Sequence, residues 1–225
     1  MNAKQAAGYR AADWVEDGMI VGLGTGSTAY YAIEKIGERV GQGLKIKAIA
    51  TSNASEELAK QYHIPLIHAS EVEQLDLAID GADEVDSNMA LTKGGGGALL
   101  REKLVAINSK RFIVIADHSK MVPHLGSFKL PIELVPFCYE WTLGQLRRNY
   151  NVPIEMRTRD GELYVTDNGN YIADAAFGVI SDPGKLSQEL KAMTGVVEHG
   201  LFVNIADTVV VGYEDGRTEV IEKKY

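Results

Sequence analysis

The sequence predicts an α/β protein with a parallel sheet covered by helices, together with a smaller second domain of the α+β class. Short β-rich runs alternate with helix-like stretches up to about Gly126, which is typical of βαβ units in a parallel sheet. After Gly126, several extended runs follow one another closely. Apolar strands return in the tail, so we expect the chain to divide into residues 1–126 plus 200–225 and residues 127–199.

The first part of the chain carries the expected parallel strands and the helices between them. The strand at Met19–Leu23 is short and apolar, and a glycine-rich turn follows it. Ser52 or Asn53 is a suitable N-cap for the helix after the second strand. The predicted strands are Met19–Leu23, Lys45–Ala50, Asp76–Ile79 and Phe112–Ala116, and the predicted helices are Thr28–Val40, Ser52–Tyr62 and Ala98–Asn108.

The second part of the chain mixes extended runs with two helices. Asn168-Gly169 is a strong tight-turn signal, because both residue types tolerate a positive φ. Asp182 is a suitable N-cap, with Pro183 at the first helical position. The predicted extended runs are Leu130–Val135, Pro153–Arg157, Glu162–Thr166 and Tyr171–Ala175, the helices Tyr139–Asn149 and Pro183–Met193, and the tail strands Thr208–Val211 and Thr218–Ile221.

Composition excludes several classes of protein. The chain has 225 residues, of which 45% are hydrophobic and 24% are charged, an ordinary globular composition. A formal net charge of −8 without a basic cluster argues against nucleic-acid binding. Because no apolar run reaches the ~18–20 residues of a membrane helix, we expect no membrane partner. Cys138 is the only cysteine and no signal sequence opens the chain, so we expect a cytoplasmic protein.

The first candidate loop is glycine-rich and lies between a predicted strand and a predicted helix. Glycines there let the backbone approach a ligand, and N–H groups at a helix start bind anions. The spacing is G-x-G-x-G, with no acidic residue at the tip of the second strand and no nucleotide-binding lysine motif. A small phosphorylated ligand therefore fits better than a dinucleotide or a nucleoside triphosphate, although a tight packing turn would look similar. The loop residues are Gly24, Thr25, Gly26, Ser27 and Thr28.

The second candidate loop is acidic. Asp80 and Asp83 follow the third predicted strand, which points them toward the carboxyl edge of the sheet. They could accept hydrogen bonds from sugar hydroxyls or carry protons, while an ordinary Asp-Gly surface turn is the plainer interpretation. Asp86 continues a spacing of three, but no histidine or cysteine lies nearby, so we expect no metal.

The third candidate loop contains Lys93 and four successive glycines, and it precedes the helix that carries Glu102. Such a glycine run is costly in backbone entropy and usually lets a ligand or another backbone pass closely. The helical neighbours of Glu102 are apolar, so burial would raise the pKa of its carboxyl toward the range of a general base. A first-turn glutamate that only favours the helix dipole is the alternative.

A weaker candidate is Lys120, which follows the fourth predicted strand in the segment Asp117-His118-Ser119-Lys120. It could meet a phosphate there, or it could be an ordinary solvated lysine. The five histidines form no metal-ligand pair, and the chain has no G-x-S-x-G nucleophile motif.

These loops, in this order, resemble the ribose-5-phosphate isomerases of the A type. The matching stretches cover nearly the whole chain, and as an ordered set they are highly specific. Gly97 and Leu100 stand where that family often has alanine and threonine, and neither change removes a reactive group. The stretches are VGLGTGSTAYYAI (21–33), DGADEVD (80–86), KGGGGALLREK (93–103), IADHSK (115–120), TDNGNYIAD (166–174) and GVVEHGLF (195–202).

The resemblance implies a Rossmann-like domain with a smaller, ferredoxin-like α+β domain inserted near its end. It also implies a cofactor-free, homodimeric or homotetrameric isomerase that interconverts ribose 5-phosphate and ribulose 5-phosphate in the pentose phosphate pathway. Glu102 matches the family's proton-abstracting glutamate, and Lys93 is our candidate donor to the enediolate oxygen. Asp80 and Asp83 match its acidic loop and would move hydroxyl protons. The matching substrate-binding positions are Gly24–Thr28, Gly81, Ala82, Gly94, Gly95, Gly96 and Lys120.

Three other functions stay open from the sequence. Related α/β folds carry acyl-CoA transferase and amino-sugar-phosphate deaminase activities. A non-catalytic sugar-phosphate sensor is the alternative of a different class, although the chain lacks a DNA-binding segment and keeps both Lys93 and Glu102.

Overall fold

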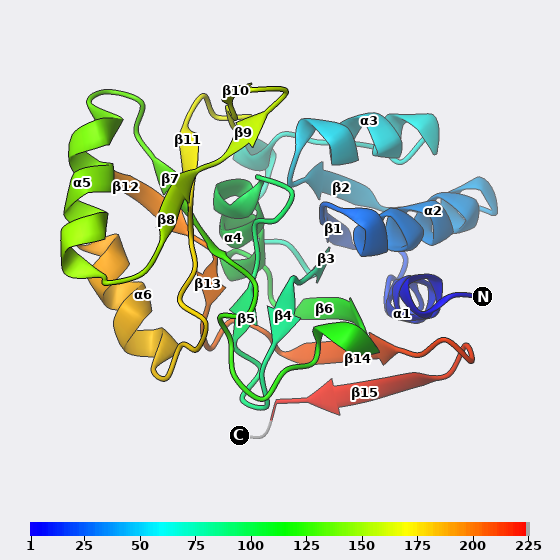
Figure 1. Cartoon of the computed structure of the whole chain (residues 1–225). Coiled ribbons are helices and arrows are strands. Elements are labelled where there is room, and N and C mark those ends of the chain that lie inside the picture. The colour runs from blue at the N-terminus through cyan, green and yellow to red at the C-terminus, as the bar shows by residue number, and fades with distance from the viewer. Residues whose placement is uncertain (224–225) are drawn as a thin grey trace. The chain divides into compact units, whose positions relative to one another are not determined.

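A computed structural model describes residues 1–223 and forms two compact units (Figure 1). Unit 1 comprises Met1–Ala82, Arg101–Met121 and the described part of Ile205–Tyr225, and unit 2 comprises Asp83–Leu100 and Val122–Asn204. Residues 83–100 therefore group with unit 2, whereas the sequence places them in the first domain. The grouping reflects the pairing of β5 (Leu91–Thr92) with β4 (Glu84–Val85) and β13 (Leu201–Phe202). The domain boundaries themselves stay a prediction.

Unit 1 is built on a six-stranded sheet with the order β15-β14-β6-β3-β1-β2. All neighbours pair in parallel except β15, which runs antiparallel to β14 at the edge (Figure 1). Strand β2 pairs with one side of β1. The strands of this sheet that follow β2 in the chain, β3, β6, β14 and β15, all lie on the other side of β1. The sheet consists of β1 (Ile20–Leu23), β2 (Lys47–Ala50), β3 (Leu77–Gly81), β6 (Phe112–Asp117), β14 (Thr208–Gly212) and β15 (Thr218–Glu222).

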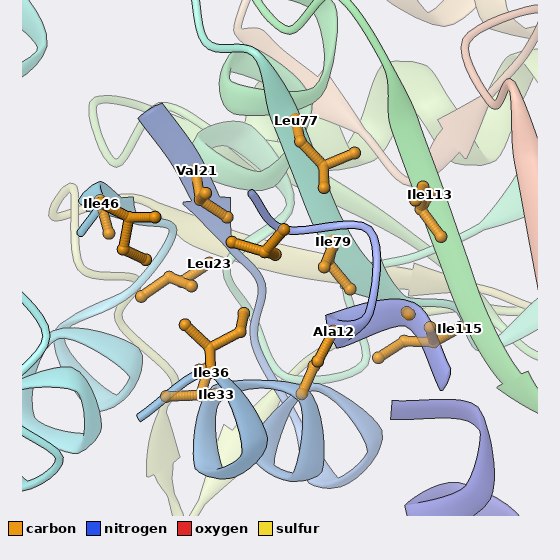
Figure 2. Close-up of a cluster of buried hydrophobic side chains, with 14 of the residues drawn as sticks. Ala12, Val21, Leu23, Ile33, Ile36, Ile46, Leu77, Ile79, Ile113 and Ile115 are labelled. Carbon is orange, nitrogen blue, oxygen red and sulfur yellow. The ribbon is translucent and has the colours of Figure 1, made fainter. Parts of the chain in front are cut away.

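Alternating residues of these strands build the main core of unit 1. Val21 and Leu23 lie beside Leu77 and Ile79 on the neighbouring strand, and all four are buried. Figure 2 shows these side chains directed toward Ile33 and its helix. They share one face of the sheet because successive side chains of a strand point to opposite faces. The helices of this unit are α1 (Ala3–Ala12), α2 (Ser27–Gly41), α3 (Asn53–Gln61) and most of α4 (Leu99–Ile107).

The opposite face of the sheet is covered by α4. A Cβ at Gly22 would overlap Val105 of this helix and lie 3.0 Å from the Cβ of Ala78. Gly22 lies between Val21 and Leu23 on the strand, so a side chain at position 22 would point to the face opposite the core around Ile33. The parallel sheet with helices on both faces confirms the predicted Rossmann-like core.

Unit 2 contains a four-stranded antiparallel sheet with the order β12-β7-β11-β8 and two helices, α5 (Tyr139–Asn149) and α6 (Pro183–Lys191). The chain order β7-α5-β8-β11-α6-β12 is the βαββαβ motif of ferredoxin-like domains, as expected. Alternate residues of β7 pack with Leu143 and Leu186 of the helices. The strands are β7 (Leu130–Leu134), β8 (Ile154–Met156), β11 (Tyr171–Ala175) and β12 (Val196–His199).

Two local features differ from the sequence-based expectation. The extended run at Glu162–Thr166 is not one long strand, because β10 (Glu162–Leu163) forms a short hairpin with β9 (Thr158–Arg159). Helix α1 has no counterpart in the prediction. Its buried side chains are all alanine, so it lacks the stripe of large apolar residues that reveals an amphipathic helix. Short 3-10 turns at Ala69–Glu71 and His118–Lys120 complete the described elements.

Candidate active site

The glycine-rich loop and Asp80 meet at the carboxyl ends of two neighbouring strands. Gly24 follows β1 and donates its N–H to the carbonyl of Ile79 at 2.9 Å, and the next N–H, of Thr25, donates to Asp80 Oδ1 at 2.9 Å. The strand order reverses between β1 and β3, and such a switch point is where open α/β sheets bind ligands. The predicted loop and the predicted acidic residue therefore lie together.

Hydroxyl groups of three neighbouring residues hold the glycine-rich loop in place through hydrogen bonds. Thr25 Oγ1 lies 2.7 Å from Thr51 Oγ1, 2.8 Å from Ser52 Oγ and 3.1 Å from Ser55 Oγ, and Ser55 Oγ donates to the Gly24 carbonyl at 2.6 Å. Thr51, Ser52 and Ser55 are buried. The Thr25 side chain is thus part of the loop's support. A cavity of about 540 Å³ adjoins this loop, and Asp80 and Glu102 are not in its lining.

The loop opens directly into helix α2. Gly26 is the N-cap with φ 102°, a conformation that suits glycine, and Ser27 and Thr28 form the first turn. N–H groups of a first helical turn lack acceptors within the helix, so they favour an anion. Lys4 of α1 donates to Ser27 Oγ at 2.9 Å and adds a cation at this helix start.

Lys4 is a candidate site residue that the sequence does not reveal. It reaches Ser27 because α1 and α2 pack very closely. A Cβ at Gly8 would lie 2.8 Å from the Ala32 backbone nitrogen. The only signal in the sequence is a glycine within an alanine-rich segment, and that signal does not name a partner helix.

Glu102 lies in the first turn of α4 and is 4% exposed. Its helix is anchored to unit 1 at Gly22 of β1 and through Arg101, whose Nη1 donates to Asn53 Oδ1 at 3.1 Å. Asn53 is the first residue of α3. It follows Ser52, whose hydroxyl group is one of those that support the glycine-rich loop. Three of the residues three or four positions from Glu102 along the chain are buried, namely Ala98, Leu99 and Ala106. The carboxylate therefore belongs to an apolar stripe, as expected.

Lys120 ends the short 3-10 turn that follows β6 and is half-buried. Asp117 caps this turn, with Oδ1 accepting from the Ser119 N–H at 3.1 Å. Since β6 is parallel to β3 and adjacent to it, Lys120 lies at the same edge of the sheet as Asp80.

Unit 2 holds the remaining predicted residues. The Lys93 N–H donates to the Gly200 carbonyl at 2.8 Å, its side chain is buried, and Nζ lies 5.5 Å from the centre of the Phe202 ring. Asp83 donates its N–H to the Thr92 carbonyl at 2.8 Å and accepts from the Gly95 N–H on Oδ2 at 2.8 Å. Asp83 and the lysine–glycine loop are thus joined by a direct hydrogen bond.

The other acidic residues of the second loop have structural roles. Glu84 is buried and accepts from Thr92 Oγ1 and from the N–H groups of Gly126 and Phe128. Asp86 accepts from the N–H groups of Asn88 and Ala90 and closes a turn.

The predicted residues therefore form two groups, one in each unit. Unit 1 holds Gly24–Thr28, Asp80, Gly81, Ala82, Glu102 and Lys120, and unit 2 holds Asp83, Lys93 and Gly94–Gly96. Across residues 1–223, no cluster of three or more histidine, cysteine, aspartate or glutamate side chains could hold a metal ion. Within the same residues, every helix is too short or too polar to cross a membrane.

Comparison with known proteins gives a consistent result. The profile of the family described as ribose 5-phosphate isomerase A (phosphoriboisomerase A) matches residues 47–216. A ribose-5-phosphate isomerase A of Bacillus mycoides is 50% identical over 220 residues, which is 97% of this chain and 99% of that protein. The Thermoplasma acidophilum protein of the same name is 51% identical over 215 residues, covering 95% of this chain and 89% of that protein.

Solved structures agree with these relatives. A D-ribose-5-phosphate isomerase in complex with phospho-erythronic acid superposes with a TM-score of 0.94 at 38% identity, covering 99% of this chain and 100% of that chain. Ribose 5-phosphate isomerase from Plasmodium falciparum superposes with a TM-score of 0.95 at 40% identity, covering 99% of this chain and 98% of that one.

Proposed function

Because this chain belongs to the ribose 5-phosphate isomerase A family, we propose that it interconverts ribose 5-phosphate and ribulose 5-phosphate with Glu102 as its base. The observation that carries the proposal is the family relationship, which covers 97% of the chain, together with the glycine-rich loop and Asp80 at the switch point of the sheet. The reaction is an aldose–ketose isomerisation of the pentose phosphate pathway.

The difficult step is the removal of a weakly acidic proton next to a carbonyl group. In the open-chain sugar, the Glu102 carboxylate takes the proton from C2 of the aldose, and the C2–H electron pair forms the double bond of an enediolate. The C1 carbonyl π pair moves onto O1, and a hydroxyl proton passes from O2 to O1. The carboxylic acid then returns its proton to C1 as C2–O2 becomes the carbonyl group of the ketose. One carboxylate serves both carbons because they are adjacent, and burial among apolar neighbours suits a general base.

Lys93 is the proposed donor to the oxygen that becomes negative in the enediolate. A cation that is already in place stabilises charge as it develops and needs no reorganisation during the reaction. The buried position of Lys93 supports this role, because electrostatic interactions are stronger away from water.

The phosphate group is proposed to bind at the start of α2. The N–H groups of the Gly24–Thr28 segment and the first helical turn favour an anion, and Lys4 adds a positive charge beside Ser27. Lys120 is a second candidate cation at the same sheet edge. Binding energy from the phosphate would hold the reacting carbons in place.

Asp80 and Asp83 are proposed to accept hydrogen bonds from sugar hydroxyl groups. They would also transfer hydroxyl protons, including during opening of the furanose ring. Asp80 accepts the N–H groups of Thr25 and Gly81 on Oδ1, and Asp83 accepts the Gly95 N–H on Oδ2. Both carboxylates are therefore oriented by backbone donors.

Three further properties complete the proposal: a cytoplasmic location, a homodimer or homotetramer, and a reaction without cofactor or metal. Light scattering of the purified protein measures the oligomer directly. A monomer at working concentration would contradict that part.

The decisive test is ribulose 5-phosphate formation from ribose 5-phosphate by the purified protein after exhaustive EDTA treatment, with Glu102→Gln measured in parallel. Fast turnover by the wild type and a near-silent variant are expected. Binding of ribose 5-phosphate without turnover would instead support a sensor. Turnover of a CoA thioester or ammonia release from glucosamine 6-phosphate would indicate the other enzyme classes.

A further inference from the structure

The glycine run after Lys93 is held at three successive carbonyl groups by side chains of the same unit. Arg157 Nη1 donates to the Gly94 carbonyl at 2.9 Å and to the Gly95 carbonyl at 3.1 Å. The Tyr164 hydroxyl donates to the Gly96 carbonyl at 3.2 Å. A glycine segment has unusual conformational freedom, so contacts that remove this freedom must come from outside the segment.

Arg157 is itself fixed before it reaches the loop. Its Nε and Nη2 donate to the two carboxylate oxygens of Asp174 at 2.9 Å and 2.6 Å, which is the planar, forked geometry of an arginine–carboxylate pair. The two side chains are only 14% and 18% exposed. Asp174 lies in β11, and Arg157 follows β8, its antiparallel neighbour. The sheet therefore sets the direction in which Nη1 points.

One peptide plane transmits this direction to an acidic side chain. The Gly94 carbonyl and the Gly95 N–H belong to the same planar trans peptide, so they point in opposite directions from one rigid group. Arg157 holds the carbonyl end, and Asp83 Oδ2 accepts the N–H end at 2.8 Å. Rotation of this plane would break both hydrogen bonds at once.

The Asp83 carboxylate occupies the space that a side chain at position 95 would take. A Cβ at Gly95 would lie 2.6 Å from Asp83 Oδ1, so the carboxylate packs directly on the loop backbone. Lys93 is bonded to Gly94, and its own N–H is held by the Gly200 carbonyl. The backbone around Lys93 is therefore fixed on both sides.

We propose that Arg157, oriented by Asp174, is a positioning residue for the isomerisation. It fixes the Gly94–Gly95 peptide plane and thereby orients Asp83 and the backbone of Lys93, without touching the substrate. Tyr164 contributes in the same way at Gly96. This inference rests on the proposed function, because it assigns Asp83 and Lys93 to the reaction.

The test measures kcat and KM separately for Arg157→Lys, Asp174→Asn and Tyr164→Phe. Lysine keeps the charge but cannot bind Asp174 and the loop at the same time. We expect kcat to fall about 10–100-fold for Arg157→Lys, with KM within about threefold of wild type, because small displacements of reacting groups cost this much. Tyr164→Phe should lose a smaller part of kcat.

Arg159→Lys is the matched control. The Arg159 guanidinium lies over the Tyr164 ring at 4.7 Å, and the residue is exposed. This variant should keep the wild-type kcat. The double variant Arg157→Lys/Asp174→Asn should be no worse than Arg157→Lys alone, because Asp174 acts only through Arg157.

The outcomes separate two kinds of failure. A wild type without turnover would contradict the proposed function itself. An active wild type whose folded Arg157→Lys and Asp174→Asn variants keep its kcat would overturn the positioning role. If Arg157→Lys does not fold, Asp174→Asn and Tyr164→Phe decide, and unchanged kcat in both would reject the proposal.

Discussion

Gly24 and Asp80 pack so closely that a side chain at position 24 has no space. An added Cβ would overlap the Asp80 carboxylate and would lie only 2.5 Å from its Cα. The same contact lets the neighbouring Thr25 N–H reach Asp80 Oδ1. Here the glycine is required by steric exclusion, and its missing side chain lets the glycine-rich loop pack directly on the acidic residue.

Gly24→Ala should therefore disrupt the loop and lower activity strongly. The overlap involves backbone as well as side-chain atoms, so we expect a loss of about 1–3 kcal/mol in the free energy of unfolding. Gly41→Ala is the control, because its Cβ would meet nothing within 4 Å at the end of α2. Urea unfolding and steady-state kinetics measure both effects, and equal stability of the two variants would contradict the packing argument.

Glu102→Gln should lower kcat by at least about 10²-fold while the protein stays folded. The amide keeps the shape of the side chain but cannot accept the C2 proton. Glu140→Gln is the matched control, since Glu140 occupies the first turn of α5 and is exposed. Loss of solvent exchange at C2, followed by NMR in deuterated water, reports on proton abstraction. Near-normal turnover by the Glu102 variant would refute the assignment.

Lys4→Met should raise KM for ribose 5-phosphate about tenfold or more, because hydrogen bonds to charged groups contribute about 1.5–3 kcal/mol. The effect on kcat should be smaller, since the phosphate does not react. Lys47→Met is a suitable control: Lys47 is exposed at the amino end of β2, away from the carboxyl edge of the sheet. The proposed phosphate contact would be wrong if Lys4→Met and Lys47→Met gave the same KM.

Glu133 should make the stability of the protein depend on pH. It is fully buried in β7, opposite Glu198 of β12, and its Oε1 accepts from Thr166 and Asn170 while Oε2 has no hydrogen-bond partner. Burial raises the pKa of the Glu133 carboxyl, the Glu198 carboxylate raises it further, and the Asn170 and Thr166 hydrogen bonds oppose the shift. The folded protein thus binds this proton more tightly than the unfolded chain does.

A raised pKa contributes stability below the unfolded value, and this contribution is lost as the pH rises through the folded value. Glu133→Gln cannot ionise, so its stability relative to wild type should increase from about pH 4 toward neutral pH. Urea unfolding at several pH values measures the difference, with Glu155→Gln as the exposed control on the same sheet. Parallel curves for wild type and Glu133→Gln would contradict this prediction.

Much of the candidate site is predictable because its signals are local. Gly24–Thr28 and Asp80 follow apolar runs that read as strands, and parallel strands bring their carboxyl ends to one edge. The apolar neighbours of Glu102 at helical spacing likewise indicated its burial. Such signals can be recognised from the periodicity of a strand or helix and from the polarity of a turn, without knowledge of the tertiary structure.

The sequence by itself thus determined the fold class, the loops proposed to carry the chemistry and, through its ordered motifs, the family. Only the tertiary structure decided that Lys4 reaches Ser27, that Thr25 turns its hydroxyl into the support of its loop, and that Arg157 holds the Gly94–Gly95 peptide. Each of these contacts joins residues far apart in the chain, and each depends on how two elements pack. Local patterns specify an element and its buried face, whereas the partner of an individual side chain is set by close packing across elements.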